Sequence, residues 1–269
     1  MLRKFNTNRT LADNIKLGGL TAFVAGMVNV ASIMIFFAFT SNITGHIAVL
    51  AEEISKGNWY QVAIVFGWIF LFFSGSFLAN FIVINLGNRK RSMAHSIPLV
   101  LEIICLSVVG IYGQFFYQET LTETELLLAL MLFAMGLQNG LTASISNFAI
   151  KTTHLTGLMT DLGILFSMFT KENYRRNQEL RDKAKLLLVI VSSYLVGGIV
   201  AGSIYLKASF LVFHIVSVIL LFIVVYDYYK LKSKIRVKKK KLFSIRSKFH
   251  AALHNEQVSY TKREQPAEG

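Results

Sequence analysis

Six long apolar stretches divide this chain, and nearly all of its lysines and arginines fall on one side of them. Each stretch is long enough to cross a hydrocarbon core, which takes about 20 residues. The stretches cover residues 17–39, 60–86, 97–117, 124–148, 185–206 and 209–229. If each crosses once and the N-terminus is cytoplasmic, only Lys56 and Lys207 of the 28 lysines and arginines lie outside. This bias predicts a six-span membrane protein with both termini in the cytoplasm.

The composition argues against several other classes of protein. With 54% apolar residues and two prolines, the chain is neither disordered nor an ordinary soluble domain. The net charge of +13 lies at the ends of spans and in the C-terminal tail, so we expect no nucleic-acid binding. Cys105 is the single cysteine, which excludes an intrachain disulfide and a thiol metal cluster. The sequence also lacks P-loop, metalloprotease and serine-hydrolase motifs, so we expect neither a cofactor nor an enzyme.

Three domains are predicted along the chain. A cytoplasmic N-terminal segment covers residues 1–16, the membrane domain covers 17–229, and a basic cytoplasmic tail covers 230–269. Residues 230–250 carry ten lysines and arginines beside an apolar stripe. This pattern is typical of an amphipathic helix on a membrane surface, with anionic lipid headgroups as its partner.

Two shorter apolar segments, at 41–54 and 153–166, separate consecutive spans. Each is too short to cross a membrane and carries a Thr-Gly pair near its start. Upstream of the first pair runs Gly26-Met27-Val28-Asn29, and upstream of the second runs Gly136-Leu137-Gln138-Asn139. The two motifs are 110 residues apart and the two Thr-Gly pairs 112 apart. We therefore expect two half-helices, each within one copy of a duplicated unit.

The predicted fold is thus all-α, with repeats at residues 17–117 and 124–229. Each repeat holds a span, a half-helix and two further spans, and three crossings invert the second repeat relative to the first. Inverted repeats with interrupted helices recur in secondary transporters, whose substrate sites lie near the membrane midplane at the repeat interface.

Polar side chains inside the spans are candidates for such a site. Asn29, Gln138 and Asn139 lie at positions where an unpaired amide is costly. They either line a cavity and bind substrate or form interhelical hydrogen bonds that hold the two repeats together.

The half-helix starts offer a second set of candidates. Thr44 and Thr156 are predicted N-caps, and Gly45 and Gly157 allow backbone or ligand to approach closely. The functional alternative is an anion or polar ligand held at the positive ends of two half-helices. His46 and His154 flank these ends, and neither has the spacing of a metal ligand.

Two carboxylates are candidates for coupling transport to a proton or cation. Glu102 lies in the third span, where it either exchanges a proton or reaches Arg91, His95 or interfacial water at the cytoplasmic end. Asp161 lies in the second half-helix, where it either interacts with the helix dipole or binds a cation.

Four motifs in order make the sequence resemble a known family. They are Ala25-Gly26-Met27-Val28-Asn29, Thr44-Gly45-His46, Met135-Gly136-Leu137-Gln138-Asn139, and His154-Leu155-Thr156-Gly157 with Thr160. On these residues the chain resembles the YoaK-type family of bacterial integral membrane proteins, a domain of unknown function. That family usually has Asp where this chain has Asn29, and Asn where it has His46. The resemblance implies the fold and a bacterial inner-membrane location, and it implies no established activity.

The leading functional hypothesis is a small-molecule transporter or permease of unknown substrate. Its predicted substrate contacts are the nine half-helix and span residues above (Asn29, Thr44, Gly45, His46, Gln138, Asn139, His154, Thr156 and Gly157), with Glu102 or Asp161 as the coupling group. The alternative is a membrane scaffold or sensor that acts through its basic tail.

Overall fold

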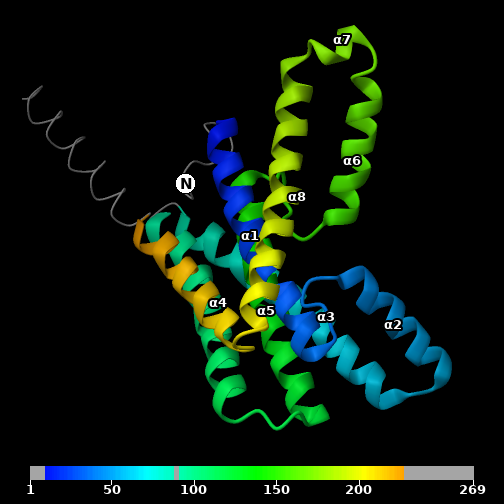
Figure 1. The fold of residues 1–269 in the computed structure, drawn as a ribbon, viewed down its shortest axis with the longest axis vertical. Helices are drawn as coiled ribbons and strands as arrows, with labels where there is room; N and C mark the ends of the chain where they lie inside the picture. The colour runs from blue at the N-terminus through cyan, green and yellow to red at the C-terminus, as the bar shows by residue number, and fades with distance from the viewer. Residues whose placement is uncertain (1–9, 88–90, 227–269) are drawn as a thin grey trace, which may run out of the picture. The chain divides into compact units, whose positions relative to one another are not determined.

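The computed structural model describes residues 10–87 and 91–226, and the helices in these ranges follow one another with short connections (Figure 1). They are α1 (Leu11–Phe36), α2 (Ile43–Lys56), α3 (Trp59–Gly87), α4 (Arg91–Phe115), α5 (Leu121–Ser146), α6 (Leu155–Met168), α7 (Glu172–Arg175) and α8 (Gln178–Tyr205), followed by the helix Leu211–Tyr226. The chain divides into two compact units, Met1–Val224 and Val225–Gly269. All but two residues of the second unit, including the predicted tail at 230–269, lie outside the described residues.

Five of the described helices are long and apolar enough to cross a membrane, namely α1, α3, α4, α5 and α8. They match the first five predicted spans within a few residues. The sixth predicted span, 209–229, corresponds to the shorter apolar helix Leu211–Tyr226, beyond which the structure does not describe the chain. Both predicted half-helices are present as α2 and α6, each 14 residues long. The architecture is therefore that of a multi-pass helical membrane protein.

Helices α1 and α5 are built alike from end to end. Both have 26 residues, and both begin with a capping box, Thr10 with Asp13 in α1 and Thr120 with Glu123 in α5. Both end at a residue in the left-handed region, Phe37 (φ 56°) after α1 and Asn147 (φ 55°) after α5. Each left-handed residue turns the chain out of the span and toward the half-helix that follows.

The two most extensive helix contacts in the described chain join α1 to α8 and α3 to α5. Each contact brings a glycine of the long helix against a backbone carbonyl of its partner. Gly26 meets the carbonyl of Tyr194, and Gly136 meets the carbonyl of Phe72 in the same way. A Cβ at either glycine would overlap that oxygen, so both contacts depend on a missing side chain. Small residues at such crossings allow the close backbone approach that stabilises helix pairs in membranes.

The same contacts run in the reverse sense. Gly197 of α8 meets the carbonyl of Phe23 in α1, and Gly75 of α3 meets the carbonyl of Phe133 in α5. Gly26 and Phe23 of α1 correspond to Gly136 and Phe133 of α5, and both pairs are separated by the same number of residues in the sequence. Phe72 and Gly75 of α3 correspond in the same way to Tyr194 and Gly197 of α8. The first span of each half therefore packs against the second span of the other half, α1 against α8 and α5 against α3.

Helix α4 packs against the helix Leu211–Tyr226 through small and polar residues. Ser107 donates a hydrogen bond to Ser217 at 3.2 Å, and Gly110 leaves space for the ring of His214. Interhelical hydrogen bonds of this kind are worth about 1 kcal/mol in a membrane. The last described helix is thus part of the bundle.

Helix α3 exposes one face on which large aromatic side chains follow one another. Phe70, Phe73, Phe77 and Phe81 are all more than half exposed, and the rings of Phe73, Phe77 and Phe81 stack in sequence. Apolar side chains on the outside of a spanning helix are typical of a surface in contact with lipid.

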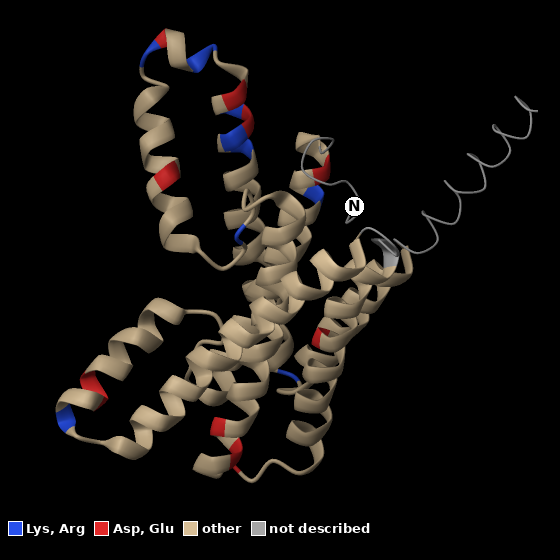
Figure 2. Cartoon of the chain, turned by 180° about the vertical axis from the view of Figure 1, so that it is seen from behind, with Lys and Arg blue, Asp and Glu red and all other residues tan. Residues whose placement is uncertain are grey.

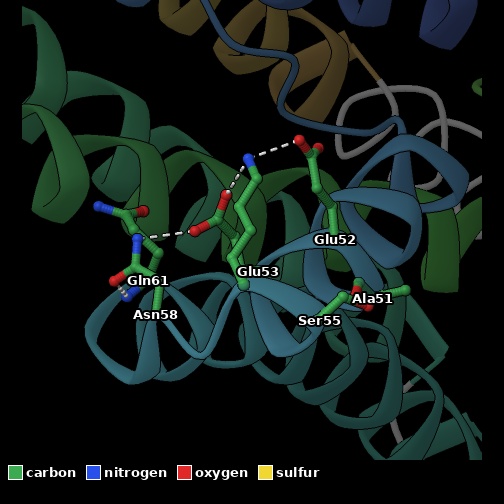
Figure 3. A network of polar contacts seen from close by, with 7 residues as sticks. Ala51, Glu52, Glu53, Ser55, Asn58 and Gln61 are labelled. Carbon is green, nitrogen blue, oxygen red and sulfur yellow. Dashed lines mark hydrogen bonds and ion pairs between the residues drawn. The ribbon is translucent and has the colours of Figure 1, made fainter.

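A polar network fixes the turn between α2 and α3 (Figure 3). Lys56 donates to Glu52 at 2.6 Å and to Glu53 at 3.3 Å, and Asn58 donates to Glu53 at 2.7 Å. The Asn58 side chain also accepts a hydrogen bond from the backbone amide of Gln61. These contacts end α2 at Gly57, whose φ of 71° suits glycine.

Charged side chains gather at α7 and at the start of α8, and are sparse within the spans (Figure 2). This distribution agrees with the predicted bias, since α7 and the start of α8 lie in the basic segment assigned to the cytoplasm. Glu102 is an exception, because it lies three turns into α4 and is fully buried.

Candidate functional site

The half-helices α2 and α6 begin two residues earlier than their Thr-Gly pairs predict. Asn42 is the N-cap of α2 and accepts a hydrogen bond from the amide of Gly45 at 3.2 Å. His154 is the N-cap of α6, and its side chain makes no capping hydrogen bond. The prediction that Thr44 and Thr156 are the N-caps is therefore wrong. Both threonines lie within the first helical turn.

Gly45 and Gly157 make room for the cap residues rather than for a ligand. A Cβ at Gly45 would lie 2.8 Å from the amide nitrogen of the Asn42 side chain, and a Cβ at Gly157 would overlap the His154 ring. Each glycine therefore lets the side chain three residues earlier fold across the first turn of its half-helix.

Asn29 binds the loop that leads from α1 to α2. Its Nδ2 donates to the carbonyl of Ala25 at 2.9 Å and to the Ser41 hydroxyl at 2.8 Å. Its Oδ1 accepts from the backbone amide and hydroxyl of Thr40, both at 3.2 Å. Asn29 is fully buried, and both of its N–H groups are used. It therefore serves as a latch that holds the start of α2, and it lines neither of the two cavities described below.

Asn139 makes the corresponding contacts in the second half, but fewer of them. Its Nδ2 donates to the carbonyl of Met135 at 2.9 Å, and its Oδ1 accepts from the hydroxyls of Thr152 and Thr153 at 3.3 and 3.1 Å. One N–H of its amide has no partner among the described residues. Asn139 is half-buried and lines a cavity.

The first cavity, of about 440 Å³, lies where the starts of the two half-helices meet. Parts of four helices and the loop between α5 and α6 line it. The lining comprises Ser41, Asn42, Ile43 and Thr44 at α2; Phe72, Ser76 and Asn80 on α3; Asn139, Gly140, Ala143 and Ser144 on α5; and Phe148, Lys151, Thr153, His154, Leu155 and Thr156 at α6. Its volume is in the range of small-molecule sites.

The lining of this cavity favours a ligand that accepts hydrogen bonds. It contains hydroxyl and amide side chains, one lysine and no carboxylate. The side chain of Lys151 makes no ion pair or hydrogen bond with any other described residue. Two helix N-termini point their positive ends toward the same region, and the first-turn amides of α6 have no side-chain acceptor.

A second cavity, of about 680 Å³, adjoins the first. Phe148, Lys151 and His154 line both of them. The rest of the second lining belongs to the start of α1, to α6 and to the start of α8, and includes Asp161, Glu179, Asp182 and Lys183. Asp161 forms an ion pair with Lys183 at 2.9 Å in which both side chains are about half exposed, so it already has a cationic partner.

The predicted site residues therefore separate into three groups. The first cavity is lined by Thr44, Asn139, His154 and Thr156, and the second by His154, Gly157 and Asp161. The remaining five, Asn29, Gly45, His46, Gln138 and Glu102, line neither cavity.

His46 packs inside the first half of the molecule. Its Nε2 donates to the carbonyl of Phe39 at 2.8 Å, and its ring meets Trp68 edge to face with centroids 5.7 Å apart. Burial lowers the pKa of His46 below its ordinary value of 6.5, which favours the neutral ring. A carbonyl can only accept, so the neutral ring carries its proton on Nε2.

Glu102 and Gln138 are fully buried on α4 and α5. Neither carboxylate oxygen of Glu102 has a hydrogen-bond partner among the described residues, and the same holds for both polar atoms of the Gln138 amide. Among the described residues, Gln138 therefore does not make the interhelical hydrogen bond that was one of its two predicted roles. The predicted alternative contact of Glu102 with Arg91 involves a side chain that lies outside the described part of the structure.

Several lining residues were not singled out from the sequence. Lys151 was counted only toward topology, although it stands three residues before His154. Ser76 and Asn80 lie one turn apart on α3, and Ser76 donates to the carbonyl of Gly136 at 3.0 Å. Their spacing of four residues is the one signal that could have placed them on a common helix face.

Comparison with known proteins gives one match. Residues 17–226 match the family described as Protein of unknown function (DUF1275). No curated protein and no solved structure matches the chain. The match covers the described helices except the start of α1, and it leaves the YoaK-type assignment a prediction.

Proposed function

Because the chain belongs to the DUF1275 family, whose function is unknown, we propose a role from its own geometry: it is a secondary transporter or permease for a small solute. The observation that carries this proposal is the first cavity, at which the starts of the half-helices α2 and α6 meet. In secondary transporters, discontinuous helices direct their ends at the substrate near the membrane midplane.

We further propose that the two halves are inverted repeats in a bacterial inner membrane, with cytoplasmic termini. The paired glycine contacts, the matching capping boxes and the two asparagine latches support a duplication. An odd number of crossings in each half would then invert the second copy.

The preferred substrate in this proposal is a small organic anion. Lys151 is the single lysine or arginine in the first lining, and carboxylates are absent from it. An anion would find the lysine, the free N–H of Asn139 and the first-turn amides of α6 as donors. Asp161 is less suited to coupling than a free carboxylate would be, because Lys183 neutralises it, and Glu102 remains the better coupling candidate.

A thermal-stability screen tests this proposal, since a ligand that binds only the folded protein raises its melting temperature. Purified protein should be stabilised by one or more small carboxylates or phosphate esters, and not by neutral sugars of similar size. Lys151→Gln should weaken the affinity about tenfold by removing a charge-assisted hydrogen bond. The matched control is Lys207→Gln, which removes a lysine that lines neither cavity and should leave the affinity unchanged.

Transport itself is then measured by uptake of the stabilising anion into proteoliposomes. Equal affinity in Lys151→Gln and the wild type would contradict the anion assignment. Binding without uptake would favour the scaffold or sensor hypothesis, in which residues 230–250 bind anionic lipid headgroups.

A further inference from the structure

In the second half of the molecule, the first cavity adjoins the larger second cavity. The second cavity begins at the side chains that the two share, and it reaches α6 and the charged start of α8. One turn beyond His154 on α6, Gly157 and Leu158 line this second cavity. A solute held in the first cavity therefore lies beside Phe148, Lys151 and His154, which also line the larger second cavity.

In the first half, large side chains occupy the turn beyond the same cavity. On α2, His46 lies one turn after Asn42, which lines the cavity. On α3, Trp68 lies one turn before Phe72, which also lines it. The His46 and Trp68 rings meet edge to face, and His46 is only 8% exposed. The hydrogen bond from His46 to the Phe39 carbonyl fixes the ring in this place.

Hydrogen bonds to α5 extend this cluster away from the cavity. The indole N–H of Trp68 donates to the backbone carbonyl of Glu125 at 3.1 Å. The Tyr60 hydroxyl donates to the carboxylate of the same residue at 2.7 Å, and Glu125 is 6% exposed. Together these contacts tie α2, α3 and α5 to one another between the cavity and the turn at Gly57.

We infer that His46, Trp68 and Glu125 close the solute route on the side of the α2–α3 turn, while the second cavity leaves it open on the side of α7. The lysines and arginines around α7 place the open side in the cytoplasm under the positive-inside bias. The structure then corresponds to the inward-open state of a carrier. This inference rests on the proposed transport function, although its test measures only which side has access to the cavity.

Sided labelling of a single cysteine tests the inference. Cys105 is the only cysteine of the chain, so Cys105→Ser provides a cysteine-free background. Ser144→Cys then places one thiol in the lining of the first cavity. A membrane-impermeant thiol reagent should label it in inside-out vesicles and leave it largely unlabelled in intact cells. Glu179→Cys, in the second cavity, marks the open side and should be labelled only in inside-out vesicles.

Opening the cluster should admit the reagent from the other side. Adding His46→Ala and Trp68→Ala should raise labelling of Ser144→Cys in intact cells about tenfold, by removing an aromatic contact and two hydrogen bonds. The milder Tyr60→Phe removes only the hydroxyl that binds Glu125, and should raise labelling about threefold. Phe70→Ala is the matched control, because it removes an aromatic ring from the exposed face of the same helix and should change nothing.

Equal labelling of Ser144→Cys from both sides before the cluster is opened would overturn the inference. The inference would also be overturned if none of the cluster variants increased the labelling of Ser144→Cys in intact cells. If His46→Ala with Trp68→Ala does not yield folded protein, Tyr60→Phe decides the question alone. One-sided labelling without uptake of any solute would leave the closed side established and count against transport only.

Discussion

Each half of this molecule has an asparagine latch, Asn29 in the first half and Asn139 in the second, and the two differ in how many of their hydrogen bonds are formed. Asn29 donates both of its N–H groups and is fully buried, whereas Asn139 donates one and lines a cavity. Both amides hold the loop before a half-helix, through Thr40 and Ser41 in one half and Thr152 and Thr153 in the other. One latch therefore has both of its N–H groups paired, while the other keeps a donor available.

A second contrast follows the first. Beyond the latch of the first half, His46 and Trp68 fill the space along α2, and beyond the latch of the second half a cavity opens along α6. The two halves thus share their glycine contacts and differ in the side chains that lie beyond their latches. Under the inverted repeat and the closed side proposed above, a few side chains would decide which end of the molecule is closed.

The largest predicted effect tests the shared part of the two halves. Gly26→Ala and Gly136→Ala would each push a Cβ into a carbonyl oxygen, of Tyr194 and of Phe72 respectively. Each should destabilise the protein by about 2 to 3 kcal/mol, as overpacked cores do. Thermal unfolding in detergent measures both. Gly67→Ala is the control, because no atom lies within 4 Å of a Cβ there, and it should be neutral or stabilising. A large loss from only one of the two glycines would break the symmetry.

The second prediction tests where the halves differ. Asn29→Ala should lower the free energy of unfolding by about 3 kcal/mol, because the amide and hydroxyl of Thr40 and the hydroxyl of Ser41 lose their partner in a buried site. Asn139→Ala should cost about 1 kcal/mol, since two of its partners are hydroxyls that can turn to other acceptors. The same unfolding measurement ranks them. Equal losses would show that the second latch is as complete as the first.

The smallest predicted effect concerns the pH dependence of the closed end. Burial lowers the pKa of His46 in the folded state, so the unfolded state binds more protons as the pH falls below the ordinary value of 6.5. The stabilising effect of neutral His46 is complete above that value and declines below it. Unfolding midpoints should fall more between about pH 7.5 and about pH 5.5 for the wild type than for His46→Gln. If the unfolding midpoints of the wild type and His46→Gln changed identically with pH, His46 would not be the source of the pH dependence.

Much of the fold could be predicted from the sequence because a membrane restricts what an apolar stretch can become. Stretches of about 20 apolar residues have few alternatives to spanning helices. The half-helices followed from their length and from the repeated Thr-Gly pairs. Asn29 and Asn139 were paired because their motif recurs in the sequence, and in the structure each binds the loop before a half-helix.

The site was harder to predict because helical periodicity shows that a residue is buried, without showing against what. Gln138 and Glu102 both lie on buried helix faces, yet neither reaches a cavity. The predicted N-cap of α2 was wrong because the Asn42 side chain supplies the capping acceptor two residues before Thr44. Lys151 went unrecognised since one lysine in a basic segment carries no signal beyond topology.

The pairing of α1 with α8 also has a consequence for biosynthesis. Helix α1 leaves the ribosome well before its main partner α8, since Gly26 precedes Tyr194 by 168 residues. At about 5 to 20 residues per second, α1 waits for about 10 to 30 s before Gly26 can meet Tyr194. During that interval Asn29 can already bind Thr40 and Ser41, which lie only a few residues downstream. The first latch can therefore shield a polar side chain in the lipid before the second half of the protein exists.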